Sequence, residues 1–472
     1  MSKRYYGVQT EKAIKNFPFD FRKTHREVIR AIVEIKRAAA RAHYLAKELD
    51  KQRADAIVRA CDEVLRGKHD DQFPLSSFQG GMGTSNHMNV NEVLAASATE
   101  ILLSGKKGIK VRPSDEQGST ERTSAKVRPS DEQGSTERTS ANVHPNDHVN
   151  MSHSTNDVMP SALKIASLRL VDEADASLEI LISALDKKAK QFANIQKLGR
   201  THIQDAVPMT LGDEFASYAE TIRRRQKGLR EARAYLIELN LGGSAVGNSI
   251  NVSPKYKKLL YRELQKVTAL PLKPAKNLMS QTASVTDFLV VSSALTALCT
   301  DLSKIAGDFR ILSSGPKGGI GELILPELQA GSSIMPGKVN PVLPEALSQL
   351  YYLVSGNNAT IEKACEGAQL ELGVMMPVIT DRLVESLKLS AEMIEQFAKK
   401  CVATVIANKP RIKEHLENST AYATLLNPII GYDKAAECVK EAVATGKTLR
   451  EVVLAKKLLS AKDFASAMNA KK

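Results

Sequence analysis

Apolar residues recur every three or four positions over several long stretches of the chain, and this period is typical of amphipathic helices. The first stretch has Pro160 suited to its first turn and Gly199 suited to a stop. Its apolar positions are Leu163, Ala166, Leu170, Leu178, Leu181 and Leu185. A second stretch, 285–312, keeps the period for about eight turns and is ended by Gly315 and Pro316.

Two further stretches, 215–241 and 347–365, show the same period. Helices of this length need partners along their whole length, so we expect residues 157–408 to form an elongated bundle shared between subunits. A monomeric bundle is the alternative. Around the bundle we predict a mixed N-terminal domain at 1–156 and a small helical C-terminal domain at 409–472. The predicted fold class is therefore mainly α, in a tetramer-forming arrangement.

Residues 110–125 are repeated without change as residues 126–141. Each copy has one valine as its only sizeable apolar side chain, together with balanced charges and many turn formers. Such a segment buries too little apolar surface to offset the entropy of ordering it. We therefore predict that 110–141 is a mobile insertion within the N-terminal domain.

The composition narrows the class of protein. Tryptophan is absent and aromatic residues make up only 5%, so Leu, Ala, Ile and Val must carry the packing. The five cysteines form no CxxC or Cys/His pattern, which indicates reduced thiols. Because neither a signal peptide nor an apolar run of membrane-spanning length is evident, we expect a soluble, cytoplasmic protein without a membrane partner.

The formal net charge of +13 raises the question of a nucleic-acid partner. However, the basic residues are interleaved with acidic ones along the helical stretches, and no nucleic-acid motif is present. The sequence therefore predicts no nucleic-acid binding. The positive electrostatic field of such a chain also attracts a small acidic substrate.

The most informative segment is the loop 331–341, Gly-Ser-Ser-Ile-Met-Pro-Gly-Lys-Val-Asn-Pro. Its two prolines exclude a regular helix or central strand, and its glycines permit unusual backbone angles. Ser332, Ser333, Lys338 and Asn340 supply hydroxyl, ammonium and amide groups, a set suited to an anion. A plain surface turn is the alternative interpretation.

Three other segments carry polar groups of the same kind. The glycine-rich segment 80–86 could bring backbone amides close to a carboxylate. Segment 152–157 precedes a predicted helix, where side chains cap the N-terminus and free N–H groups attract anions. Segment 199–205 contains Thr201 and His202. The alternative interpretation is a plain turn for segment 80–86, simple helix capping for 152–157, and a structural histidine for 199–205.

In order, spacing and identity, these four segments resemble the motifs of the fumarase/aspartase superfamily, whose members add or eliminate a small group across the double bond of fumarate. The resemblance runs from Tyr5 almost to the C-terminus and is interrupted only by the insertion at 110–141. It implies a small dicarboxylate substrate, no metal, and no organic cofactor. It also implies a homotetramer with active sites shared between subunits.

The resemblance further implies roles for single residues. Ser332 would be the base, and His202, Lys338 and Glu345 would complete the catalytic set. The residues that would hold the substrate are Thr84, Ser85, Ser154, Thr155, Asn156, Thr201, Ser333, Lys338 and Asn340. A candidate second dicarboxylate site comprises His144, Asn146 and Asp147.

Proton removal next to a carboxylate creates a doubly charged aci-form, which preorganised donors must stabilise. Lys338 and Asn340 are suited to this task. A serine is a poor base at its ordinary pKa, so Ser332 needs neighbouring N–H donors or a cation that favour its alkoxide.

Within the superfamily, segments 79–85 and 154–157 resemble the aspartase branch, which favours elimination of ammonia from L-aspartate. Segments 143–147 and 431–437 resemble the fumarase branch, and His202 with Glu345 could help hydroxide leave. Fumarate hydratase is therefore the alternative. A non-catalytic, crystallin-like role is a more remote one.

Overall fold

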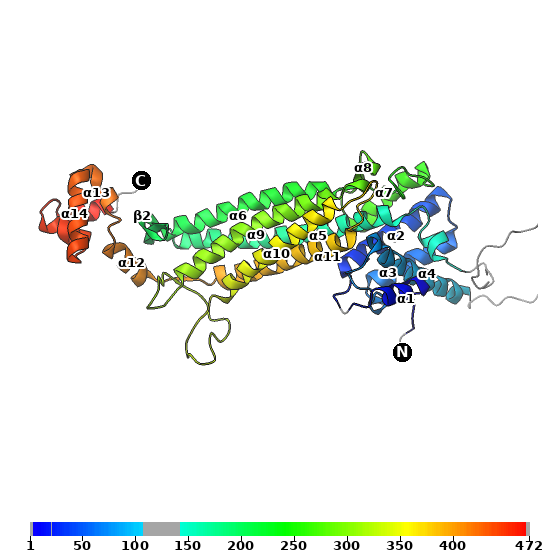
Figure 1. Ribbon diagram of the computed structural model, residues 1–472, viewed down its shortest axis with the longest axis horizontal. Helices are drawn as coiled ribbons and strands as arrows, with labels where there is room; N and C mark the ends of the chain where they lie inside the picture. The colour runs from blue at the N-terminus through cyan, green and yellow to red at the C-terminus, as the bar shows by residue number, and fades with distance from the viewer. Residues whose placement is uncertain (1–2, 20, 107–141, 469–472) are drawn as a thin grey trace, which may run out of the picture. The chain divides into compact units, whose positions relative to one another are not determined.

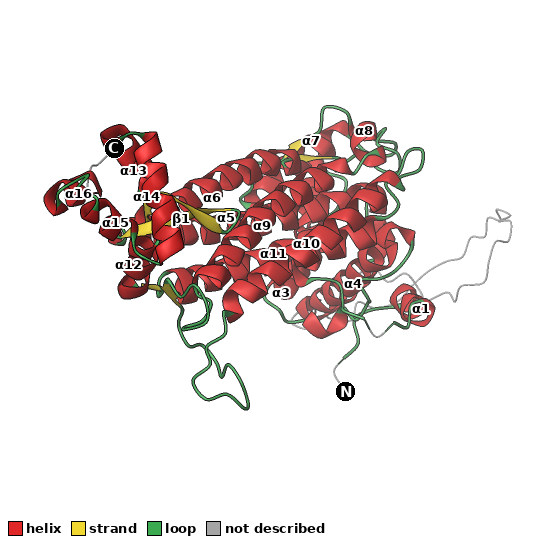
Figure 2. Ribbon diagram, turned by 60° about the vertical axis from the view of Figure 1, so that its left-hand side comes forward, coloured by secondary structure: helices red, strands yellow, loops and turns green. Residues whose placement is uncertain are grey.

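The structure is a computed structural model that describes residues 3–19, 21–106 and 142–468. The duplicated segment 110–141 lies outside these residues, so its predicted mobility stays a prediction. Within the described residues the chain is mainly helical, with three short two-stranded sheets (Figure 2). This confirms the predicted mainly α class.

The chain divides into two compact units. Unit 1 comprises residues 1–168, 234–289 and 360–384, and unit 2 comprises residues 169–233, 290–359 and 385–472. Four long helices contribute residues to both units: α5 (Thr155–Gln191), α9 (Thr286–Leu312), α10 (Val342–Glu366) and α11 (Met376–Phe397). The division into three domains that we expect from the sequence is not tested by this clustering and stays a prediction.

Unit 1 is built around α2, which packs against both α3 and α7, while α3 packs against α4. The buried face of α2 includes Val28, Ile32 and Ile35. The elements that belong wholly to this unit are α1 (Val8–Asn16), α2 (Arg26–Ala46), α3 (Lys51–Leu65), η1 (Asp70–Gln72), η2 (Gly81–Gly83), α4 (Thr84–Lys106), η3 (Pro145–Val149), η4 (Ala234–Leu236), β3 (Glu238–Leu239), α7 (Pro254–Thr268), β4 (Lys273–Pro274) and α8 (Leu278–Ala283).

Unit 2 contains a bundle in which α6 (Leu211–Arg233) lies beside parts of the four shared helices (Figure 1). Aromatic rings fill its interior: the ring of Phe309 lies 5.6 Å from Phe215 and 5.5 Å from Phe397, measured between centroids. Because these residues come from α9, α6 and α11, one aromatic cluster joins three helices. The long helices expected at 285–312 and 347–365 are confirmed as α9 and α10.

The remaining elements of unit 2 are shorter. A hairpin precedes α6, and a small sheet joins β5 to β6. Helices α13 to α16 pack around a core that includes Leu426, Val452 and Phe464, whereas Leu416 of α12 packs with Leu198 of β1. Their bounds are β1 (Gln196–Thr201), β2 (Gln204–Thr210), β5 (Leu323–Ile324), η5 (Ala398–Val402), β6 (Ile406–Ala407), α12 (Lys409–Asn418), α13 (Ala423–Ile430), α14 (Tyr432–Thr445), α15 (Leu449–Ala455) and α16 (Ala461–Met468).

The limits of α5 and the end of α6 differ from the expected ones. α5 ends at Gln191, before the stop expected at Gly199, which lies in β1. α5 begins at Thr155, so Pro160 lies inside the helix instead of in its first turn. Proline has no N–H for the carbonyl four residues earlier, that of Asn156. The side-chain amide of Asn240 donates to this carbonyl at 2.9 Å instead, which satisfies the group that Pro160 leaves free. α6 ends at Arg233, short of the expected residue 241.

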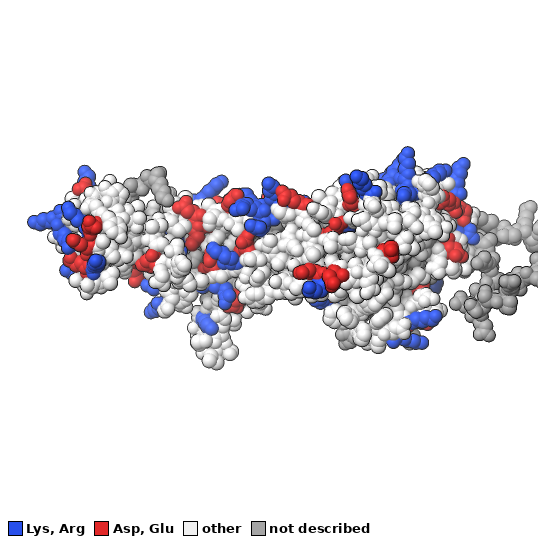
Figure 3. All heavy atoms as spheres, turned by 45° about the horizontal axis from the view of Figure 1, so that its top comes forward, with Lys and Arg blue, Asp and Glu red and all other residues white. Residues whose placement is uncertain are grey.

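The described residues include one strongly apolar helix and a surface of mixed charge. Among the described residues, α9 is the one helix long and apolar enough to cross a membrane by length and composition alone. Its Leu295, Leu302 and Phe309 are buried in the bundle. Lys and Arg side chains lie among Asp and Glu side chains on the face drawn in Figure 3, and Arg233 pairs with Asp172. All five cysteines are buried and free.

Candidate functional site

The turn at 80–86 lies directly before α4. Gly81, Met82 and Gly83 all have positive φ, at 71°, 60° and 90°. A Cβ atom on Gly83 would lie 2.9 Å from Cε of Met159 on α5, so the turn lies close to this helix, and the φ of 90° itself favours glycine at residue 83. Thr84 then begins α4, and its hydroxyl donates to the carbonyl of Gly81 at 2.8 Å.

Segment 152–157 forms the N-terminal cap of α5. The N–H of Asn156 donates to the hydroxyl oxygen of Ser154 at 3.2 Å, and the N–H of Ser154 donates to the carboxylate of Asp157 at 3.0 Å. This reciprocal cap fixes the first turn of the helix. The side-chain amide of Asn156 donates to the carbonyl of Ala245 at 2.8 Å. The expected N-terminal cap is therefore present.

Asp157 joins this cap to the loop that follows β3. Its second carboxylate oxygen accepts the N–H groups of Gly242 and Ser244 at 2.9 and 3.0 Å. Burial raises the pKa of Asp157 to about 6, against the lowering effect of these hydrogen bonds. The carboxylate therefore has a positioning role that the sequence did not assign to it, although it lies inside the segment that the sequence singled out.

Unit 1 brings the first two segments together. Besides the contact between Gly83 and Met159, Nδ1 of His87 on α4 lies 3.0 Å from the hydroxyl of Thr155 on α5. Thr84 and Ser85 of one helix start and Ser154, Thr155 and Asn156 of the other are thus held on helix N-termini joined by these contacts. Free N–H groups at two helix starts are suited to a carboxylate.

The candidate second site lies on η3, a short π-helix in the same unit. Nδ1 of His144 accepts the N–H of Asp147 at 3.1 Å, and a carboxylate oxygen of Asp147 lies 3.2 Å from the same nitrogen. His144, Asn146 and Asp147 are exposed. Their use as a dicarboxylate site stays a prediction.

Segment 199–205 is a β-hairpin in unit 2, which the sequence did not predict. β1 pairs with β2 so that Thr201 lies opposite Gln204, and the turn residues His202 and Ile203 both have positive φ, at 56° and 62°. Positive φ at both positions is the conformation of a type I′ hairpin turn. Thr201 and His202 are consequently exposed at the tip of the hairpin.

The loop 331–341 has no regular secondary structure, as its prolines predict. It closes on itself: the side-chain amide of Asn340 donates to the carbonyl of Gly331 at 2.7 Å. The hydroxyl oxygen of Ser332 accepts the N–H groups of Ile334 and Met335 at 3.2 and 3.1 Å. Two N–H donors on one oxygen favour its negatively charged form, which is the environment that a serine base needs.

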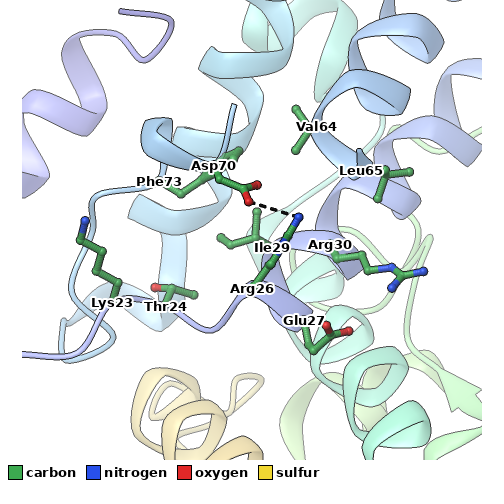
Figure 4. A pocket seen from close by; sticks show the side chains of 10 residues that line it. All are labelled: Lys23, Thr24, Arg26, Glu27, Ile29, Arg30, Val64, Leu65, Asp70 and Phe73. Atoms are coloured by element: carbon green, nitrogen blue, oxygen red, sulfur yellow. Dashed lines mark ion pairs between the residues drawn. The ribbon is translucent and has the colours of Figure 1, made fainter. Parts of the chain in front are cut away.

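A cavity of about 450 Å³ lies elsewhere in unit 1, and one of about 380 Å³ lies beside the loop in unit 2. The loop cavity is lined by Lys338, Gly337 and Asn408 among others. Glu345 lies in the first turn of α10, where its N–H donates to the carbonyl of Pro341. The first cavity contains none of the predicted site residues, and its wall includes the ion pair of Arg26 and Asp70 (Figure 4).

A buried carboxylate supports both segments of unit 2. Glu322 is fully buried directly before β5, and its oxygens lie 3.2 Å from Nζ of Lys197 and 2.8 Å from Nη2 of Arg200. Both cations belong to β1 of the hairpin. The strand that leads toward the 331–341 loop is therefore tied to the hairpin that carries Thr201 and His202. Nothing in the sequence around Glu322 indicated this role.

Within the described residues, no group of three or more His, Cys, Asp or Glu side chains is arranged to hold a metal ion.

The structure places the predicted site residues in two sets, one in each unit. Unit 1 holds Thr84, Ser85, Ser154, Thr155 and Asn156, whereas unit 2 holds Thr201, His202, Ser332, Ser333, Lys338, Asn340 and Glu345.

Comparison with known proteins points to one group of enzymes. A family model described as lyase matches residues 2–356, and one described as fumarase C C-terminus matches residues 423–472. An aspartate ammonia-lyase of Helicobacter pylori is 40% identical over 97% of this chain and 91% of its own length. A class II fumarate hydratase of Halalkalibacterium halodurans is 39% identical over 98% of this chain and 93% of its own length.

Solved structures agree with these relatives. A fumarate lyase:delta crystallin from Brucella melitensis, bound to cobalt, has a TM-score of 0.87 and 38% identity over 99% of this chain and 95% of its own. A class II fumarase from Schistosoma mansoni also has a TM-score of 0.87, with 33% identity over the same shares of the two chains.

Proposed function

Because the chain belongs to the fumarase/aspartase superfamily of lyases, we propose that it eliminates ammonia from L-aspartate to give fumarate, and catalyses the reverse addition. The observation that carries this choice is the contact between the two segments that resemble the aspartase branch. The turn at 80–86 and the cap at 152–157 meet through His87 and Thr155. Their polar groups are therefore available to one substrate.

Ser332 is the base in this proposal. Its hydroxyl oxygen already accepts two backbone N–H groups, and such donors favour the alkoxide over the neutral hydroxyl. The alkoxide takes a proton from Cβ of aspartate, the carbon next to the side-chain carboxylate. The C–N bond then breaks, its electron pair leaves with the nitrogen, and fumarate remains.

The intermediate places two negative charges on one carboxyl group, and preorganised donors reduce the energy of that state. Lys338 and Asn340 supply a cation and an amide from the same loop as the base. Thr201 and His202 supply further donors from the hairpin tip. On the other side, Thr84, Thr155 and Asn156 hold the second carboxylate and the amino group at the two helix starts.

The two sets of residues belong to different units of the chain. Membership of the superfamily supports a site completed by more than one subunit. We propose a homotetramer in which the 331–341 loop of one copy serves the helix starts of other copies. A cytoplasmic location is proposed on the same footing.

Fumarate hydratase is the second candidate. The exposed pair of His144 and Asp147 lies in the segment that resembles the fumarase branch, and a class II fumarate hydratase is among the relatives. In that case His202 and Glu345 would protonate the leaving hydroxide.

The deciding experiment is a parallel assay of the purified protein for fumarate formation from L-aspartate and from L-malate. We expect aspartate to be the faster substrate at saturation and ammonia to appear in equal amount to fumarate. Malate dehydration that is faster by an order of magnitude would transfer the assignment to fumarate hydratase. Failure with both substrates would favour the non-catalytic role.

A further inference from the structure

Lys36 is a buried lysine on α2 whose ammonium group is fully inside unit 1. Its Nζ donates to the side-chain oxygen of Asn150 at 2.7 Å and lies 3.1 Å from Nδ1 of His153. Both partners are neutral. By contrast, the buried Lys164 has the carboxylate of Asp287 at 2.6 Å. A buried ammonium that has only neutral groups in hydrogen-bond contact is costly to fold, so a use beyond packing is worth seeking.

The contacts of His153 define which atom donates. A lysine ammonium can only donate, so Nδ1 of His153 accepts and the ring proton lies on Nε2. Nε2 lies 2.8 Å from the hydroxyl of Tyr256 on α7, to which it can donate. While Lys36 is charged, the ring of His153 is therefore held between α2 and α7 in one tautomer.

A second residue of α2 holds the same stretch of chain. His43 stacks on the ring of Tyr256 with 3.7 Å between centroids, and its Nε2 lies 3.1 Å from the carbonyl of Met151. Residues 150, 151 and 153 are thus each held from α2. Between them Ser152 has a φ of 61°, a conformation that a residue with a side chain keeps only where its surroundings impose it.

The next residues along the chain are Ser154, Thr155 and Asn156, the candidate substrate-binding cap of α5. We propose that Lys36 and His153 form a positioning pair that holds residues 150–153 and thereby places this cap for dicarboxylate binding. The inference rests on the proposed function for its substrate. Neither residue touches substrate in this scheme, so both act through the cap.

The charge of the pair depends on groups from several elements. Burial lowers the pKa of Lys36 to about 7, and the carboxylate of Asp157 opposes this. The neighbouring Cys61 is a neutral thiol, because burial raises its pKa. Desolvation lowers the pKa of His153 well below its usual 6.5, and the positive charge of Lys36 adds to the effect. The nearby His43 and His87 also have lowered pKa values because they are buried. Glu48 hydrogen-bonds His43. Tyr256, whose hydroxyl contacts His153, is a further titratable group, and burial raises its pKa well above the usual value.

Lys36 therefore carries its charge below about pH 7 and loses it above. A cation near the cap favours binding of a substrate that carries two carboxylates, so we expect the Michaelis constant for L-aspartate to rise as the pH increases through this region. Lys36→Met, which removes the charge and both hydrogen bonds, should raise that constant about tenfold or more and abolish this pH step. The rate constant at saturation should change less.

Two further variants separate positioning from simple loss of packing. His153→Gln offers an oxygen to Lys36 and an N–H to Tyr256, as the histidine tautomer does, whereas His153→Leu offers neither. We expect the Gln variant to keep more of the affinity than the Leu variant. These variants also serve as the test if Lys36→Met fails to fold.

The matched control is Lys188→Met, because the buried Lys188 donates to a single neutral group, the carbonyl of Val405, at 2.7 Å in unit 2. This variant should leave the Michaelis constant and its pH dependence as in the parent. Hydrogen exchange of peptides covering 150–157 supplies a readout that needs no activity. Exchange there should be faster in Lys36→Met than in the parent and in Lys188→Met.

The outcomes distinguish the two hypotheses. If the parent produces no fumarate from aspartate or malate, the proposed function fails, while the exchange measurement still tests the positioning pair. If the parent is active and Lys36→Met keeps the parent Michaelis constant, pH step and exchange rate, the positioning role is wrong. Equal affinity in His153→Gln and His153→Leu would also overturn it.

Discussion

Glu322 and Arg200 form an ion pair with 2.8 Å between Oε1 and Nη2, and the carboxylate of this pair is fully buried. The pair joins the residue before β5 to the hairpin strand β1. Lys197 shares the same carboxylate. A buried charge cluster of this kind is a weak source of net stability, but removal of Glu322 takes away the carboxylate that pairs with Arg200, whereas Lys197 keeps Glu214 at 2.8 Å.

We predict that Glu322→Gln lowers the free energy of unfolding by on the order of 3 kcal/mol at pH 7. The sign of the pH effect follows from the carboxyl group. Burial raises the pKa of Glu322, but the hydrogen bond from Arg200 and the charge of Lys197 outweigh it and hold the pKa below the usual 4.5. The stabilisation is therefore present above about pH 4.5 and is lost as the pH falls through the lower folded value.

Chemical denaturation at pH 7 and at pH 4 measures this difference. The gap between parent and variant should shrink at the lower pH. Glu414→Gln is the control, because Glu414 pairs with Arg411 and is exposed; it should have little effect at either pH. An equal gap at both pH values would show that Glu322 acts through packing and not through its charge.

The second prediction concerns the base. Ser332→Ala should reduce the rate constant for fumarate formation by a factor of about 10³ or more and leave the melting temperature nearly unchanged. The alanine removes only the oxygen that accepts the N–H groups of Ile334 and Met335. Ser217→Ala, which changes an exposed serine of α6 outside the predicted site, is the control and should keep most of the rate. Substantial activity in Ser332→Ala would assign the base to another residue.

The sequence predicted the long helices because their apolar residues repeat over many turns. α9 and α10 contain the expected stretches, with buried leucines at the expected spacing. The start of α5 was less predictable. Pro160 normally marks a first turn, but here the side chain of Asn240 satisfies the carbonyl of Asn156, which lies 84 residues away in sequence. Local rules cannot anticipate a hydrogen bond from such a distance.

The hairpin at 196–210 could not be recognised from its turn. Rules for two-residue turns favour Asn and Gly because both positions need positive φ, whereas this turn uses His202 and Ile203. The individual polar motifs were recognisable because each is local. Lys36 could not be recognised from the sequence, because one lysine among the apolar residues of α2 looks like a side chain directed toward solvent. Only the packing of the folded chain reveals its buried contacts.

The third prediction tests site sharing between subunits. Asn156→Ala and Ser332→Ala alter residues in unit 1 and unit 2, and each variant alone should be nearly inactive. If sites combine copies of the chain, hybrids formed by co-expression contain some sites with both residues intact. We therefore expect activity to return in the mixture. Two variants of the same loop, Ser332→Ala and Lys338→Ala, serve as the control and should not complement each other.

The last prediction concerns Lys338, which projects from an exposed loop and lines the cavity beside it. In the proposed reaction, one carboxyl group gains a second negative charge only as the proton is removed. A cation facing that group therefore stabilises the transition state more than bound substrate. Lys338→Ala should reduce kcat/KM for aspartate by about 10²–10³, while its affinity for fumarate falls by only about tenfold. Steady-state kinetics and product inhibition measure the two quantities.

Lys317→Ala, a change to another exposed lysine of unit 2, is the control for loss of overall positive charge and should alter both quantities only slightly. Equal losses in kcat/KM and in fumarate affinity would mean that Lys338 binds the ground state and the transition state alike, and the stabilisation of the aci-carboxylate would then belong to other donors.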